Sequence, residues 1–180
     1  MIAEFDFLMS IYHRVTPNQI LAAVGEKVEH LVQTELPKAV QAEFEGLELS
    51  AVVDPISYPE FVLLQMPLIP NLQWDAFTVK VEGNIILQNL ALLQIPFEVH
   101  ISTKAEVAAE SPLETPADSF EQAYRIEYQT EITHSLLSKD ETIQHHLKVW
   151  FVPHVGTVKT ESEQGTTELI EYTLVPTIEE

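Results

Sequence analysis

Histidine and carboxylate side chains are the groups in this sequence that could do chemistry. His145 and His146 are adjacent, but neighbours on a strand point to opposite faces, so the two cannot share a metal ion without a bulge. Carboxylates are abundant, yet no spacing singles out an acid–base pair. The sequence also lacks a Gly-rich phosphate loop, a His-Glu-x-x-His helix motif and a Gly-x-Ser-x-Gly elbow. We therefore predict a protein that is not an enzyme, with no catalytic residues and no cofactor.

A second histidine pair depends on how one hairpin is aligned. If 138–141 is the tight part of a turn, paired residue numbers sum to 279 and His134 faces His145. Two interpretations stay open. In the first, two neutral imidazoles cap the core, their folded pKa lies below the unfolded value, and stability falls as the pH drops through that unfolded value. In the second, the two histidines bind zinc together with Asp140 or Glu141. Two histidines and one acid are too few ligands to name a site, so no metal is predicted.

Charge and composition exclude several classes of partner. The chain has 180 residues, and 9 Lys and Arg against 28 Asp and Glu give 9 − 28 = −19. Such a charge argues against nucleic acid and against anionic lipid surfaces, because both are bound through basic side chains. No apolar stretch reaches the roughly 18 residues of a membrane-spanning helix. There is no cysteine, which excludes disulfides and thiol nucleophiles.

The first ten residues are apolar but contain Glu4 and Asp6. A secretory signal needs a basic start, an unbroken apolar stretch and a small-residue cleavage site, and none is present. We expect a cytoplasmic protein from the sequence as written, and an envelope location if it is a trimmed chain.

The N-terminal quarter shows helical periodicity. Thr16 and Pro17 match the N-cap and the first position of a helix, and apolar residues recur at helical spacing after them: Ile20, Leu21, Val24, Val28, Leu31 and Val32. This predicts a long helix from Pro17 to Thr34. A shorter helix follows from Pro37, and Gly46 ends it. The apolar stripe is expected to pack on a sheet, and the alternative is a helix that binds a partner.

After Gly46 the hydrophobic period changes from 3.6 to 2, which indicates strands. Gly83-Asn84 is expected to be a turn. Residues 105–119, rich in Pro, Ser and acids, are expected to be a loop. The last hairpin is predicted around residues 163–165, with Val158 opposite Ile170.

Two strands in the second half alternate most regularly. Tyr124–His134 and Thr142–Val152 are predicted to form a hairpin that pairs apolar faces. Trp150 and Phe151 then point to opposite faces, so one of them is expected to lie over the helix or over a neighbouring molecule. Gly156, between Pro153 and Val158, is expected to have a positive φ.

Three motifs carry a resemblance to a known group. Residues 63–74 resemble a leucine–proline segment that leads to a Trp, residues 116–128 resemble a "P-A-G-x-F-x-x-Y-x-I-x-Y" strand entry, and residues 149–159 resemble "W-Y-x-P-G-x-G-x-V-K", followed by an "E-L-x-x-Y" strand. These motifs are similar to those of uncharacterised bacterial envelope-associated β-domains and, distantly, of LolA-like lipoprotein carriers. His154 and Asp118 stand where the group has Gly. The resemblance implies a curved sheet and transfers no catalytic residue.

Together these patterns predict an α+β fold. We expect a predominantly antiparallel, curved sheet of about seven to eight strands, with a helical segment over 1–46 packed on a β domain over 47–176 as one globular unit.

The predicted function is a non-enzymatic soluble domain, structural or protein-interacting. The alternative is a carrier of a hydrophobic ligand, such as a lipid or lipoprotein, in a cavity of the sheet. Residues that would line that cavity, or fill it as core, are Tyr124, Tyr128, Ile132, Leu147 and Phe151. The oligomeric state is left open, with edge strands as one route to a homo-oligomer.

Overall fold

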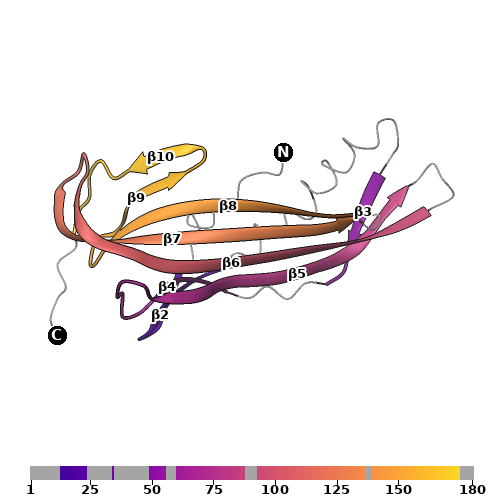
Figure 1. Ribbon diagram of the computed structural model, residues 1–180, viewed down its shortest axis with the longest axis horizontal. Helices are drawn as coiled ribbons and strands as arrows, with labels where there is room; N and C mark the ends of the chain where they lie inside the picture. Colours follow the sequence, from indigo (N-terminus) through magenta and orange to yellow (C-terminus); the bar gives the residue numbers. More distant parts are fainter. Residues whose placement is uncertain are drawn as a thin grey trace. The chain divides into compact units, whose positions relative to one another are not determined.

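In the part of the chain that the structure describes, ten strands form two antiparallel sheets (Figure 1). The computed structural model describes residues 13–23, 34, 49–55, 60–87, 93–136 and 139–174. The small sheet has the order β1-β2-β4 and the large one β10-β9-β8-β7-β6-β5-β3. The large sheet is therefore a meander from β5 to β10 with β3 added beside β5. The strands are β1 (His13–Val15), β2 (Gln19–Ala22), β3 (Leu49–Val53), β4 (Phe61–Gln65), β5 (Gln73–Leu87), β6 (Leu93–Glu114), β7 (Ser119–Leu136), β8 (Lys139–Val152), β9 (Gly156–Ser162) and β10 (Gly165–Glu168).

The predicted α+β fold with a long N-terminal helix is wrong, because no helix forms in the part of the chain that the structure describes. Thr16 and Pro17 begin a tight turn instead of a helix: the Thr16 N–H donates to the Gln19 carbonyl (2.8 Å), and the Gln19 N–H donates to Thr16 Oγ1 (3.0 Å). Thr-Pro suits the first two positions of a turn as well as those of a helix. The following residues pair as β2, with Ile20 opposite Leu64. The rest of the predicted helix, and the one expected from Pro37, lie outside the described residues.

Two segments predicted to be irregular are strands. Gly83 and Asn84 lie within β5, and β6 continues to Glu114, so the connection to β7 is only Thr115–Asp118. The loop prediction rested on proline and acidic residues. It missed that Ala105 and Val107 alternate with exposed or half-exposed neighbours and are both buried. Burial of one face outweighs the low strand propensity of a few exposed residues.

Two hairpin registers differ from those predicted. Near the turn between β7 and β8, side-chain contacts join residues whose numbers sum to 275, as in Thr133–Thr142 (Oγ1–Oγ1 3.1 Å) and Glu131–Gln144 (Oε2–Nε2 3.4 Å). The strands are separated by two residues, 137–138, and not by four, which accounts for the difference from 279. In the last hairpin, Glu168 pairs with Lys159 across a two-residue turn. That register is shifted by one from the predicted one.

The chain divides into two compact units. In the first, described over 13–23, 49–55, 60–66, 75–87, 93–103, 131–136 and 139–144, the odd-numbered residues of β5 and β6 form the core. Val81 and Ile101 are fully buried there. Phe61 of the small sheet stacks on Phe77 of the large sheet, with ring centroids 5.9 Å apart.

The second unit is described over 67–74, 104–130 and 145–174. Trp74 meets Tyr128 edge-on, with ring centroids 6.3 Å apart, and Ile126, on the same strand as Tyr128, is fully buried. A separate apolar cluster consists of the buried Phe120, Ala123, Val152 and Val158, with Leu113, Trp150, Val155 and Leu169 packed against it. Nowhere in the described ranges is there a helix of the length and apolar character needed to cross a membrane.

Candidate functional site

The residues predicted to line a cavity occupy different depths. Tyr124, Tyr128 and Ile132 are buried, whereas Leu147 and Phe151 are half-buried. The Tyr124 hydroxyl accepts a hydrogen bond from Gln122 Nε2 at 2.7 Å, and burial raises the pKa of Tyr128. Four of the five belong to the second unit, and Ile132 belongs to the first. Their role in binding stays a prediction.

The predicted facing of His134 and His145 is wrong. His134 Nε2 lies 3.4 Å from Glu141 Oε2, and its neighbour Ser135 hydrogen-bonds Asp140, both in the 275 register. Across the described residues, no group of three or more His, Asp or Glu side chains could hold a metal ion.

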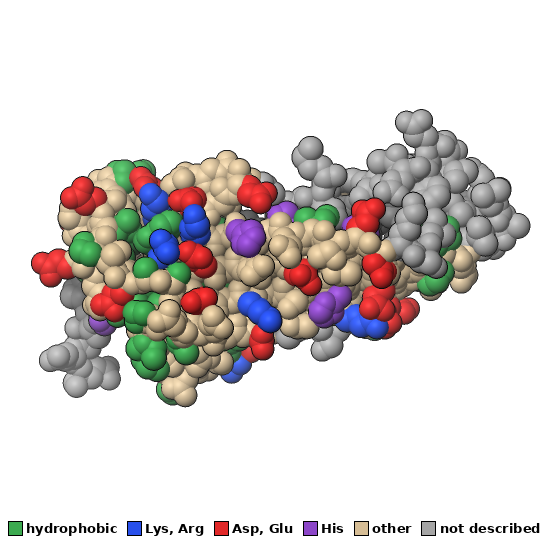
Figure 2. All heavy atoms as spheres, in the orientation of Figure 1, with side chains coloured by type: hydrophobic (Ala, Val, Ile, Leu, Met, Phe, Trp, Pro, Cys, Tyr) green, Lys and Arg blue, Asp and Glu red, His purple; other side chains and the backbone are tan. Residues whose placement is uncertain are grey.

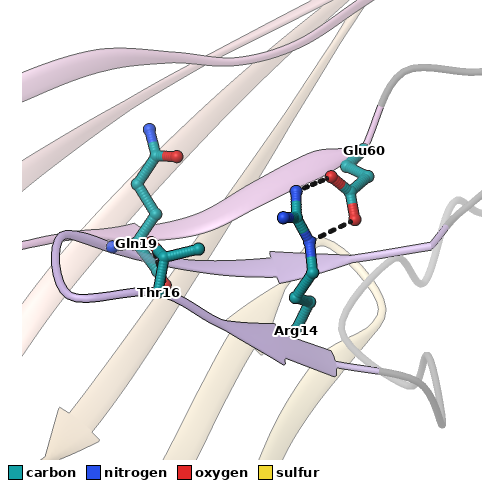
Figure 3. A network of polar contacts seen from close by, with 4 residues as sticks. All are labelled: Arg14, Thr16, Gln19 and Glu60. Carbon is teal, nitrogen blue, oxygen red and sulfur yellow. Dashed lines mark hydrogen bonds and ion pairs between the residues drawn. The ribbon is translucent and has the colours of Figure 1, made fainter.

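A polar cluster on the small sheet is shown in Figure 3. The Arg14 and Glu60 side chains point toward each other and form a two-point ion pair, in which Arg14 Nε donates to Glu60 Oε1 at 3.1 Å. Both groups are exposed, and each shifts the pKa of the other toward the charged form. The pair links β1 to the residue before β4, and because exposed ion pairs are weak we expect it to add little to stability.

Cations and acids alternate on one face of the second unit, where β7 to β10 lie side by side. In the first row, Lys159 of β9 lies between Trp150 of β8 and Glu168 of β10. In the second row, two residues along, Glu161 lies between Lys148 and Thr166. Both rows hold ion pairs: Lys159 Nζ to Glu168 Oε1 at 2.7 Å and Lys148 Nζ to Glu161 Oε1 at 2.8 Å.

Strand β7 extends both rows. Continued along both strands, the 275 register sets Arg125 beside Trp150 and Glu127 beside Lys148. Two observations support this continuation: Ala123 and Val152 lie in one apolar cluster, and the charge of Arg125 reaches Glu161 and lowers its pKa. Arg125 Nε is 3.1 Å from Glu127 Oε1, without the alignment of a hydrogen bond. We call the eight residues the charged face: Arg125, Glu127, Lys148, Trp150, Lys159, Glu161, Thr166 and Glu168.

The electrostatics of the charged face are balanced. The hydrogen bond from Lys148 and its positive charge hold the pKa of Glu161 below its ordinary value, with smaller contributions from Lys159 and Arg125. Three cations and three acids give the face a formal charge of 3 − 3 = 0, in a chain of −19. Figure 2 shows basic and acidic side chains next to one another beside hydrophobic ones.

Trp150 is the apolar centre of the charged face. Its indole is half-buried against the cluster around Val152, and Lys159 Nζ lies 5.4 Å from its ring centroid. A bulge follows directly, because Trp150 pairs with Lys159 while Phe151 pairs with Thr157, which leaves Val158 as the extra residue. The bulge turns the end of β9 and lets Val158 enter the apolar cluster.

Sequence reasoning placed Trp150 and Phe151 on opposite faces but missed the charged face as a unit. The signal was present as an alternation of charge along single strands, Arg125 with Glu127 and Lys159 with Glu161. The registers of the sheet bring these residues side by side on one face, and those registers were not predicted correctly from the sequence.

Comparison with known proteins returned no match: no family model, no curated protein and no solved structure is similar to this chain. The resemblance to LolA-like β-domains therefore stays a prediction.

Proposed function

We propose that this protein is a non-enzymatic domain that works by contacting another protein. The charged face carries the proposal, because it combines a half-buried Trp, an Arg and paired charges on four adjacent strands. Trp and Arg are the residue types most enriched at the energetic centres of protein interfaces.

The neutral character of this face also supports a protein contact. A chain with a net charge of −19 repels other acidic proteins. A face on which cations and acids are equal in number does not add to this electrostatic repulsion. The cost of desolvating its ion pairs is moderate, since their side chains are between 22% and 44% exposed and already partly shielded.

The alternative, a carrier of a hydrophobic ligand, would use Tyr124 and Tyr128 as cavity lining. Both are buried, and the Trp74 ring packs edge-on against Tyr128. Side chains packed in this way serve as core, which favours the protein-interaction function.

Native mass spectrometry of the purified full chain tests the choice between the two. We expect masses of the polypeptide, monomer or dimer, without bound lipid, and no binding of a fluorescent fatty acid added as probe. A co-purified lipid, displaced stoichiometrically by that fatty acid, would replace the interaction proposal with the carrier alternative.

A further inference from the structure

The charged face is self-complementary, and we infer that its partner is a second copy of this chain. This inference rests on the proposed function and names the partner. On β7 and β9 the two residues that contribute to the face have opposite charges, Arg125 with Glu127 and Lys159 with Glu161. On β8 they are a cation and an aromatic ring, Lys148 and Trp150, which can attract each other across an interface. The two rows are therefore complementary on three strands, and on β10 the axis described next would set Glu168 against the neutral Thr166 of the partner subunit.

A two-fold axis that lies between the rows and runs across the strands exchanges them. Two faces stacked about this axis place Arg125 against Glu127 of the partner subunit and Lys159 against Glu161 of the partner subunit. Trp150 meets Lys148 of the partner subunit, a cation–π contact of the kind that Lys159 already makes within one chain. In such an isologous contact every interaction occurs twice.

Net charge selects this face for self-association. Two copies of a −19 chain repel each other wherever acids outnumber cations. Arg125, Lys148 and Lys159 are three of the nine cations of the whole chain, and they lie together with an equal number of acids. Contact through the charged face therefore adds alternating attraction, whereas contact through a face rich in acids would add further repulsion.

The size of the face sets the expected affinity. Eight residues per copy are fewer than the roughly 20–30 per partner of a standard interface. We expect a weak dimer, in the micromolar to millimolar range, that salt weakens because its side chains are partly exposed.

Sedimentation equilibrium of the full chain over a concentration series, at low and high salt, tests the inference. Wild type should dimerise at low salt. R125E should raise the dissociation constant about tenfold or more, because it sets like charges against each other at two symmetric positions. The swap R125E/E127R should restore dimerisation, because it preserves both the internal pair and the pair across the axis.

K104E is the matched control, since it makes the same change in net charge at an exposed position outside the charged face. Equal weakening by K104E and R125E would show general repulsion and overturn the inference, as would a dimer that R125E leaves intact. A wild-type chain that is monomeric at every concentration would also overturn it.

The lipid experiment decides the proposed function separately. If R125E fails to fold by circular dichroism, E127R takes its place, because it creates the same like-charge contact with arginines.

Discussion

Asn71 and His154 occupy the same position in two turns of the same kind. Each follows a proline, each has φ = 68°, and each is spanned by a hydrogen bond: Leu72 N–H to the Ile69 carbonyl and Val155 N–H to the Val152 carbonyl, both 3.1 Å. Proline followed by a positive φ defines a type II turn, whose third position favours Gly or Asn. Asn71 satisfies that preference, and His154 does not.

His154→Gly should therefore stabilise the protein. A left-handed conformation costs a non-glycine residue roughly 1–2 kcal/mol. Glycine also increases the conformational entropy of the unfolded chain, which offsets part of that gain, so we expect the free energy of unfolding to rise by about 0.5–1 kcal/mol. Urea unfolding of the variant measures it. Asn71→Gly is the control and should change the free energy of unfolding by less. A loss of stability in His154→Gly would mean that the imidazole makes a contribution of its own.

Gly83→Ala should be the more damaging of two glycine substitutions. A Cβ at Gly83 would lie 2.4 Å from the Val52 carbonyl oxygen and 2.7 Å from the Phe97 ring. The clash with a neighbouring backbone should cost about 3 kcal/mol, the upper end for overpacking. Thermal unfolding reports the loss.

Gly156→Val separates conformational strain from crowding. Gly156 has φ = 110°, as the sequence predicted, and a Cβ there would meet nothing within 4 Å. Only backbone strain remains, so the loss should be about 1 kcal/mol. A larger loss of stability in Gly156→Val than in Gly83→Ala would contradict the prediction, because it would show that the close approach of β3 and β6 to Gly83 does not make an added Cβ costly.

Acid should destabilise the charged face through Glu161. Its folded pKa lies below the ordinary value, so its contribution is complete above the unfolded pKa and is lost as the pH falls through the folded pKa. Melting temperatures of wild type and Glu161→Gln should converge as the pH is lowered. Glu163→Gln, in the exposed turn of the same hairpin, is the control. Curves that stay parallel down to pH values where Glu161 is protonated would contradict the role of Lys148.

Alkali should act on the segment that follows β10. The Tyr172 hydroxyl donates to Asp118 Oδ2 at 2.9 Å, and this bond, with the charge of Asp118, raises the pKa of Tyr172. Its contribution is therefore complete below the unfolded pKa and is lost as the pH rises through the folded pKa. Ultraviolet titration should show one tyrosine fewer in the higher-pKa group of Tyr172→Phe than in wild type. An unchanged profile would show that the hydroxyl does not sense Asp118.

Antiparallel pairing and several strands followed directly from alternation, since Tyr124 to Ile132 and Phe77 to Val81 are buried as their period requires. The helix prediction failed because Thr16-Pro17 and the apolar residues after it fit two structures equally at the local level. Pairing of Ile20 with Leu64, more than forty residues away, decided between them. Such a partner is not visible in a local period.

The charged face could not be predicted from the sequence for a related reason. It depends on turn lengths, and a two-residue turn in place of a longer one changes which residues meet. In the last hairpin that difference set Leu169, not Ile170, opposite Val158, where the Leu169 N–H donates to the Val158 carbonyl at 2.9 Å. Ile170 is 76% exposed as a result.

The environment of Gly83 also limits how this gene can change. Every missense mutation of a glycine codon adds at least a Cβ, and at this position the added atom meets the carbonyl of one neighbouring strand and the aromatic ring of another. Relief would need a simultaneous change at Phe97 and a shift of the backbone at Val52, which no single nucleotide substitution provides. Codon 83 should therefore tolerate only synonymous changes in a saturation-mutagenesis library selected for folding. At codon 165 an added Cβ would have open space, but the glycine has φ = 143°, so a substitution there should carry the cost of backbone strain alone and be depleted less than one at codon 83.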